Sequence, residues 1–405
     1  MKKFNSNKNK KAKAFTVKGA AALIIAAILA AALLFTGCNQ PSGSSSGGNS
    51  GNSGNSGGGG NGGGGGTPPA PPAVGSFEDT GDGFIKITPP ANGIVGVAPD
   101  YALPGSEAWW KGVFRAGRKV KLSPYKLGKT EVTYKLWKEV YDEAVKPGHG
   151  YVFANAGKKG SSGTGSEDEP VTTISWRDCI VWCNAYTQIK LGSDEQCVYR
   201  KSKTDSTVLK NATDTAACDA AYADMSKKGF RLPTEVEWEY AARWQGSNTE
   251  NAAQYGDVWL TKLNSASGAK KPIGFSGLAL PAGETWETLR DELTRVAVYG
   301  EWWNGTGWVD QTPATTKTAA VKSKDPNALG LYDMSGNVWE WCFDWYGSIG
   351  AGEVIDPQGA ASGTDRVERG GSWRGDADYC TVGRRSFDSP GSRRYSLGFR
   401  LAWCP

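Results

Sequence analysis

The sequence has a single histidine, His149, among 405 residues, and this scarcity excludes several kinds of active site. A Ser-His-Asp triad would have to use that residue, and an iron or zinc site built from several histidines cannot form within one chain. His149 lies in a Pro-Gly-His-Gly segment, which is typical of a surface loop. We therefore expect an ordinary loop residue and no histidine-based catalysis.

CxxC pairs are absent, although the chain has eight cysteines, so a structural zinc site is not indicated. Cys38 belongs to the N-terminal segment described next. The folded part keeps the other cysteines, an odd number, so at least one has no partner for an intramolecular disulfide. Cys197 and Cys218 flank an insertion rich in Lys, Thr and Asp, and a disulfide between them is one way to close it.

The N-terminus combines a basic segment with an apolar run. Lysines crowd residues 1–18, which contain no acid, and residues 19–35 are apolar. Followed by Thr-Gly-Cys, this pattern predicts a lipoprotein signal over residues 1–38 in which Cys38 carries the lipid; a plain transmembrane anchor is the alternative. Removal of the signal changes the net charge of +5 to about −2, so we infer no nucleic-acid partner.

Residues 39–75 are mostly Gly, Ser, Asn and Pro, a composition that has almost nothing to bury. We expect a flexible, disordered linker with a stiffer proline-rich end. Behind a lipid anchor, such a linker would hold a folded domain, residues 76–405, away from the membrane. The sequence therefore predicts a monomeric lipoprotein of the bacterial cell envelope, displayed at the outer-membrane surface.

Regular secondary structure is predicted for only part of the folded region, from N-capping residues and from apolar spacing. The expected elements are strands at 84–87 and 119–127 and helices at 134–144, 176–189 and 235–243. Residues 244–327 show no clear period. The predicted fold class is α+β with much irregular structure and a core rich in Trp and Tyr.

Several ordered motifs carry a resemblance to a known family. They lie at residues 170–176, 229–243, 330–341, 369–373 (Arg-Gly-Gly-Ser-Trp) and 397–400 (Leu-Gly-Phe-Arg). In content and order they resemble the formylglycine-generating-enzyme (sulfatase-modifying factor) family. The resemblance covers about residues 80–405 and implies a C-type-lectin-like fold.

The resemblance also implies where the chemistry of an enzyme would lie. The family's enzymes oxidise a sulfatase cysteine to formylglycine with copper held by two cysteines. Gly375 stands at the first of these positions, and Cys380 falls where the second would lie. Because one thiolate leaves a Cu(I) site incomplete, the prediction is a protein without catalytic activity. The alternative is a copper-dependent oxidase that uses Cys380 and another thiol.

A calcium site is implied by the same resemblance. The positions that match the family's ligands are Asp333, Gly336, Val338 and Glu340. Two carboxylates together with backbone oxygens suit a hard cation. The alternative is that Asp333 and Glu340 hydrogen-bond to loop amides.

Residues 374–395 are rich in Arg, Asp, Ser, Gly and Tyr and contain no Lys, Glu, Gln, Trp or Met. Those five types cannot be reached from an AA-pyrimidine codon by changing its adenines alone. The stretch thus resembles the variable regions that retroelements diversify at adenines, as in the variable lipoproteins of treponemes. An ordinary loop of the family is the alternative. Its arginines Arg384, Arg385 and Arg393 either pair with local aspartates or bind an acidic partner.

The composition of this stretch suits a binding surface, because Tyr, Ser, Gly, Asp and Arg recur in adaptable paratopes. The predicted function is the binding of an external protein or glycan, and a purely structural envelope protein is a further alternative. The candidate ligand-binding residues are Trp373, Arg374, Gly375, Asp376, Asp378, Tyr379, Thr381, Ser386, Phe387, Asp388, Ser389, Arg393 and Tyr395.

Overall fold

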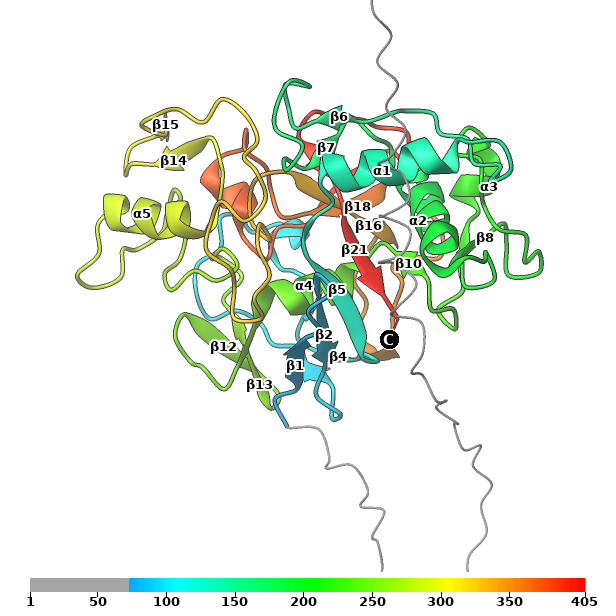
Figure 1. Ribbon diagram of the computed structural model, residues 1–405. Helices are drawn as coiled ribbons and strands as arrows, with labels where there is room; N and C mark the ends of the chain where they lie inside the picture. Colours follow the sequence, from blue (N-terminus) through cyan, green and yellow to red (C-terminus); the bar gives the residue numbers. More distant parts are fainter. Residues whose placement is uncertain (1–72, 405) are drawn as a thin grey trace, which may run out of the picture. The chain divides into compact units, whose positions relative to one another are not determined.

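The computed structural model describes residues 73–404 (Figure 1). The predicted signal, Cys38 and most of the predicted linker lie outside these residues, so the lipid anchor stays a prediction. Among the described residues, no helix is both long enough and apolar enough to cross a bilayer.

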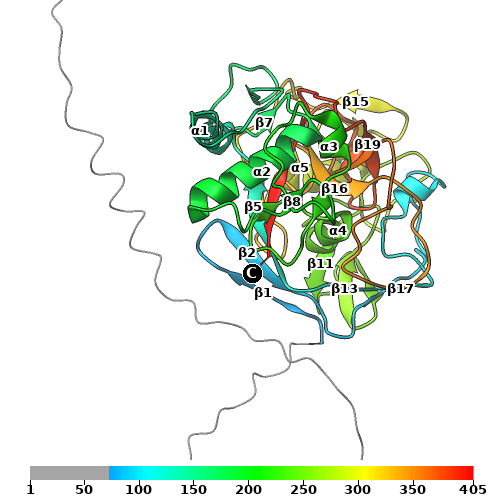
Figure 2. The ribbon, with the colours of Figure 1, turned by 90° about the vertical axis from the view of Figure 1, so that its right-hand side faces the viewer.

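Short helices and short strands alternate with long irregular segments, which confirms the predicted α+β class. The helices are α1 (Tyr134–Ala144), α2 (Trp176–Leu191), α3 (Thr215–Asp219), α4 (Glu235–Arg243) and α5 (Trp286–Val296), with 3-10 turns η2 (Ala108–Trp110) and η3 (Ala377–Cys380). Helix α2 packs against α1 and β10, beside the largest sheet (Figure 2).

Two sheets carry the scaffold. The largest is antiparallel and orders β1 (Ser76–Asp79), β2 (Phe84–Thr88), β5 (Tyr125–Glu131), β21 (Arg400–Trp403) and β10 (Phe230–Arg231). The second orders β19 (Ser386–Asp388), β18 (Arg366–Arg369), β16 (Trp339–Trp345) and β20 (Leu397–Gly398). Because the chain passes directly from β20 into β21, the two sheets are joined near the C-terminal end of the described chain.

Smaller sheets fill the periphery. Two have three strands: β17 (Gly352–Ile355), β4 (Arg118–Lys121) and β3 (Ile94–Val95), and β11 (Trp244–Gly246), β13 (Val258–Thr261) and β12 (Ala252–Tyr255). The pairs are β14 (Glu301–Trp303) with β15 (Trp308–Asp310), β6 (Lys158–Lys159) with β7 (Val171–Thr172), and β8 (Tyr199–Arg200) with β9 (Tyr222–Ala223). Figure 1 shows α5 and the β14–β15 hairpin at the opposite end of the domain from α1 and α2.

The three predicted helices are confirmed, and their caps explain where they begin. The Thr133 hydroxyl accepts from the Leu136 amide at the start of α1. Both α2 and α4 begin with reciprocal capping boxes, in which the N-cap side chain and the third residue of the helix satisfy each other's amides. Each cap satisfies amides that have no partner inside the helix.

Two predictions are wrong. Residues 119–127 are not one strand: the chain breaks at Pro124, which cannot donate to a sheet, and β4 and β5 belong to different sheets. Residues 244–327 are not wholly irregular, because they contain α5. Its buried Leu289, Leu293 and Val296 recur at helical spacing, a signal that the sequence did carry.

Large aromatic side chains form much of the core beneath α1 and α2. The indoles of Trp137 and Trp182 stack with ring centroids 5.5 Å apart, and Phe399 meets both rings edge-on at 5.9 and 5.6 Å. Both indole N–H groups reach backbone carbonyls, so the rings are buried without an unsatisfied donor. Phe399 lies between β20 and β21, which ties the last strands to the helices.

We expect Trp182→Ala to lower the free energy of unfolding by about 3–5 kcal/mol, because it leaves a cavity beside two rings that keep their positions. Urea unfolding followed by circular dichroism measures this change. The matched control is Ile355→Ala, a truncation at an exposed side chain, which should change stability by less than about 0.5 kcal/mol. Equal losses in the two variants would contradict the packing described above.

Candidate functional site

The stretch between β18 and β20 leaves the scaffold after β18, pairs with β18 again as β19, and returns at β20. At its start, Gly371 has φ +80°, and a Cβ there would lie 2.8 Å from the Tyr379 carbonyl oxygen. Only glycine allows this close approach of two backbone segments. At its end, Leu397 pairs with Trp339 in parallel register. Residues 372–396 are therefore held between fixed ends.

An exposed aromatic–arginine group marks one part of this stretch. The rings of Trp373 and Tyr395 lie 5.8 Å apart, and the Arg374 guanidinium lies 5.6 Å from the Tyr395 ring centre. Arg374 also donates to the Tyr395 hydroxyl. Arg374 and Tyr395 are exposed, and the buried Trp373 indole N–H has no hydrogen-bond partner in the described structure.

A second part surrounds η3. The ring of Tyr379 stacks on Trp110 at 6.5 Å, and the Arg384 guanidinium lies 4.4 Å from the Trp110 ring. Burial raises the pKa of Asp378 to about 6 and lowers the pKa of Arg384. One Asp378 carboxylate oxygen and two Arg384 nitrogens are buried without a hydrogen-bond partner among the described residues. Such groups are rare and costly, and they would gain from a ligand that supplies the missing bonds.

A third part is formed by β19 and the residue after it. The Phe387 ring is 48% exposed and packs on Tyr346 with centroids 4.4 Å apart. Ser386 donates to Glu368 at 3.0 Å. Asp388 accepts from the Ser389 amide, and Ser389 itself is exposed. Phe387 is thus an apolar side chain that the fold supports from one side only.

Not every predicted ligand residue faces solvent. Thr381 is buried and donates its hydroxyl to the Asp378 carbonyl at 2.8 Å, so its role is to close the turn after η3. This corrects its assignment to the surface. Gly375 and Asp376 are half-buried against the start of β14: the Gly375 carbonyl accepts from the Gly300 amide at 2.8 Å. Burial and then the nearby Glu301 raise the pKa of Asp376.

Arg384, Arg385 and Arg393 form no ion pair with the local aspartates in the described structure, whereas their neighbour Arg394 lies 3.3 Å from Asp388. Arg385 is buried and pairs with Glu235 of α4. Arg384 stacks on aromatic rings, as described above. Arg393 is exposed and donates to the side chain of Asn155. Composition alone showed neither the distant partners nor the buried position of Arg385.

A buried ion network fastens the middle of the stretch to α4. The Arg385 guanidinium donates to both Glu235 oxygens at 2.7 and 2.8 Å. Arg369 of β18 bridges Glu235 at 3.3 Å and Glu239 at 2.8 Å, and Arg243 completes the network on Glu239 at 2.8 Å. Although burial alone would raise it, Arg385 and Arg369 hold the pKa of Glu235 below its ordinary value.

Glu340, one of the predicted calcium ligands, instead pairs with an arginine. Both carboxylate oxygens accept from Arg400, at 2.6 and 2.7 Å, and one also accepts from the Trp238 indole at 2.8 Å. A guanidinium in this place supplies the positive charge that a calcium ion would bring. Glu340 therefore does not fit a calcium ligand in this arrangement.

The remaining predicted calcium positions lie in the turn before β16. One Asp333 oxygen accepts from the Lys322 amide at 2.9 Å and the other is buried without a partner, while burial raises the pKa of Asp333 to about 6. The amides of Gly336 and Val338 donate within the protein. No three acidic, cysteine or histidine side chains group as a metal site within residues 73–404. Calcium binding therefore stays a prediction, and Asp333 is the one predicted side-chain ligand that still fits it.

The residues present do not fit a copper centre at Cys380. Its thiol is fully buried, and burial raises its pKa, with Asp378 and Asp376 acting in the same direction. Copper(I) needs thiolates, and these surroundings disfavour one. Gly375 supplies no second ligand. His149 lies in a surface loop, as predicted, and its Nε2 atom lies 3.4 Å from Glu143 Oε1.

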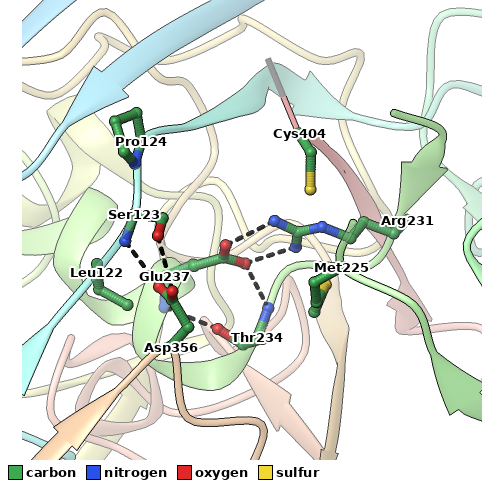
Figure 3. A pocket seen from close by; sticks show the side chains of 9 residues that line it. All are labelled: Leu122, Ser123, Pro124, Met225, Arg231, Thr234, Glu237, Asp356 and Cys404. Atoms are coloured by element: carbon green, nitrogen blue, oxygen red, sulfur yellow. Dashed lines mark hydrogen bonds and ion pairs between the residues drawn. The ribbon is translucent and has the colours of Figure 1, made fainter. Parts of the chain in front are cut away.

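A separate cavity of about 100 Å³ lies where β10 meets the end of β21 (Figure 3). Its Arg231 and Glu237 form two hydrogen bonds of 2.6 Å, and Asp356 accepts twice from Ser123, so the carboxylates lining it are engaged. Cys404 points into it and is the cysteine of the described chain that is not fully buried. The disulfide considered for Cys197 and Cys218 is not formed, since both are free thiols.

Comparisons with known proteins agree with this geometry. The family model described as a sulfatase-modifying factor enzyme 1-like domain matches residues 91–405. The solved structure of Treponema denticola variable protein 1 is 32% identical, with a TM-score of 0.51, over 82% of this chain and 99% of that one. The formylglycine-generating enzyme of Streptomyces coelicolor is 35% identical over 186 residues, 43% of this chain.

The chain spans only part of several curated relatives. The match covers 46% of the Streptomyces coelicolor enzyme and 21% of serine/threonine-protein kinase pkn1 of Chlamydia pneumoniae. It covers 71% of a chaperone protein, LppX, of Paenibacillus barcinonensis, which is 30% identical over 256 residues. The relatives thus share the domain while their names describe different activities.

We expect Glu235→Gln to lower the free energy of unfolding by about 3–5 kcal/mol, because it leaves two buried guanidinium groups without their shared charge partner. Urea unfolding measures the change. Glu353→Gln, which removes an exposed carboxylate that pairs with two lysines, is the matched control and should have little measurable effect. If both variants unfolded at the same urea concentration, the buried network would not be a main source of stability.

Proposed function

Since this chain belongs to the sulfatase-modifying factor (formylglycine-generating enzyme) family, we propose that it is a family member that binds an external ligand and does no chemistry. The ligand surface is formed by residues 373–395, excluding the buried side chains. The observation that carries the proposal is the set of buried polar atoms without partners on Trp373, Asp378 and Arg384. These atoms are themselves buried, and the side chains around them are exposed (Arg374 and Tyr395) or half-buried (Tyr379).

The likeness to Treponema denticola variable protein 1 supports this choice of site. The structural match runs over 99% of that protein at 32% sequence identity. Gly375 and the buried Cys380 thiol favour a binding protein over an oxidase, because copper would find one protonated thiol. The ligand is an external protein or a glycan.

The same proposal includes the lipid anchor and the way in which the ligand surface is diversified. Cys38 would carry lipid, and residues 39–75 would hold the monomeric domain away from the envelope. Retroelement diversification, if it acts on residues 374–395, would have to spare Thr381 and Arg385, whose side chains are buried. Changes at Arg374, Phe387 and Tyr395 would alter the surface with little effect on the core.

We expect a variant with four substitutions, Arg374→Ala, Asp378→Asn, Phe387→Ala and Tyr395→Ala, to lose at least tenfold in affinity for any ligand identified on a panel of purified glycans and surface proteins. These side chains supply the exposed rings and charges of the stretch, and a few such residues dominate most interfaces. Biolayer interferometry on the unsubstituted and substituted chains measures the loss.

The control for that experiment is Phe77→Ala, which truncates an aromatic ring that is 43% exposed and lies outside the stretch. Its affinity should equal that of the unsubstituted chain. Unchanged binding by the fourfold variant would exclude the surface around Arg374, Asp378, Phe387 and Tyr395 as the ligand site. Absence of any ligand on the panel, with a correctly folded chain, would favour a purely structural protein.

We expect Asp378→Asn alone to stabilise the fold at pH 7.5, by up to about 3 kcal/mol. In the folded state the pKa of the Asp378 carboxyl group is about 6, whereas its ordinary pKa is 3.8. A raised carboxyl pKa means that stability falls as pH rises between those values, so the benefit of the substitution should vanish near pH 4. Urea unfolding at both pH values measures it, with the exposed Asp310→Asn as control. A benefit that persisted at pH 4 would contradict this cause.

A further inference from the structure

Two open hollows lie on either side of Arg177, beside the end of the proposed ligand surface. One, of about 360 Å³, is lined by Asn155, Arg177, Thr213, Gly391 and Arg393 among others. The second, of about 640 Å³, is lined by Arg177 again, and by residues of α3, the loop 361–364 and Ser389–Pro390. Each hollow thus has one wall from residues 389–393 and one from the scaffold.

We propose that these hollows form one cleft for an acidic oligosaccharide, with the sugar carboxylate in the first hollow and a neighbouring ring in the second. The proposal rests on the proposed function and names the chemical class of its ligand. It adds scaffold residues, Asn155, Arg177 and Trp345, to a surface that the sequence placed in residues 373–395 alone.

The first hollow is built for an anion. Its charged lining residues are Arg177 and Arg393, and no acidic side chain lines it. Asp219 fixes Arg177 through its Nε and Nη2 atoms, both at 2.8 Å, and no hydrogen bond within the described structure uses Nη1. A rigid guanidinium with a free nitrogen loses little entropy when it binds a carboxylate.

Gly391 keeps that nitrogen accessible. A Cβ at position 391 would lie 3.0 Å from Arg177 Nη1, so a larger residue would cover the atom. The nearby buried Asp178 does not oppose an anion strongly, because its carboxylate already accepts from the Ala154 and Asn155 amides and from Ser175. The hollow also adjoins the N-terminal end of α2, whose dipole favours negative charge.

The second hollow suits a sugar ring. Trp345 contributes a half-buried indole whose position is fixed, because the Arg366 guanidinium lies 3.4 Å from its ring centre. Ser362, Thr364 and Ser389 supply hydroxyl groups around it. An aromatic face can pack on the C–H face of a sugar while hydroxyls bond its edge. Asp219, the one acid in this hollow, is already paired with Arg177.

The test uses isothermal titration of the full chain with sialyllactose and a hyaluronan tetrasaccharide, against lactose and hexaglutamate. We expect one of the two acidic sugars to bind, with no binding of lactose and weaker binding as salt rises. Gly391→Val, which covers Arg177 Nη1, and Arg393→Gln should each weaken binding at least tenfold. Lys138→Gln removes a distant exposed charge and should leave it unchanged.

Three results would overturn the proposal: failure of both acidic sugars to bind at millimolar concentration, tighter binding of hexaglutamate, or binding that survives both Gly391→Val and Arg393→Gln. The surface variants keep the two tests apart. If a panel ligand is lost in the fourfold variant but not in Gly391→Val or Arg393→Gln, the proposed function stands and the cleft is wrong. If the fourfold variant loses nothing while Gly391→Val and Arg393→Gln lose the sugar, the cleft stands and the surface around Arg374, Asp378, Phe387 and Tyr395 is wrong; if none of the variants loses binding, both fail.

Discussion

The buried pairing of α4 with arginines from distant parts of the chain is the interaction on which the rest of the fold depends. Glu235 and Glu239 lie one helical turn apart and face Arg369, Arg385 and Arg243 where no water reaches them. Removing charges from water is costly, so each of these groups requires its partner. The network thereby fixes α4, β18 and the middle of residues 372–396 in one arrangement.

This arrangement separates stability from recognition. The charged groups that hold the fold together are buried and paired with one another, as at Glu340 with Arg400. Some of the buried polar atoms of the described chain that have no partner lie in residues 372–396, on Trp373, Asp378, Arg384 and Arg394, and others are spread through the scaffold. The exposed side chains of this stretch can change while the scaffold keeps its own interactions.

The sequence predicted the elements that depend on neighbouring residues, such as the capped helices. It did not predict the ion pairs between residues far apart in the chain. The caps at Thr133, Ser175 and Thr234 act within one helical turn, so α1, α2 and α4 could be read directly. The aromatic core and the two ends of the ligand stretch followed from motifs. The partner of Arg385 lies 150 residues away, and that of Glu340 lies 60 away, so no local pattern could show that they are engaged.

The anchoring of Arg385 has a consequence for the energetics of recognition. A free stretch between β18 and β20 would have to be ordered as a whole each time a ligand bound, at a cost in chain entropy. With its middle fixed to α4, the stretch becomes two shorter loops that are each closed before any ligand arrives. Binding then costs less ordering, and a substitution in one loop need not disturb the shape of the other, so the two could evolve separately.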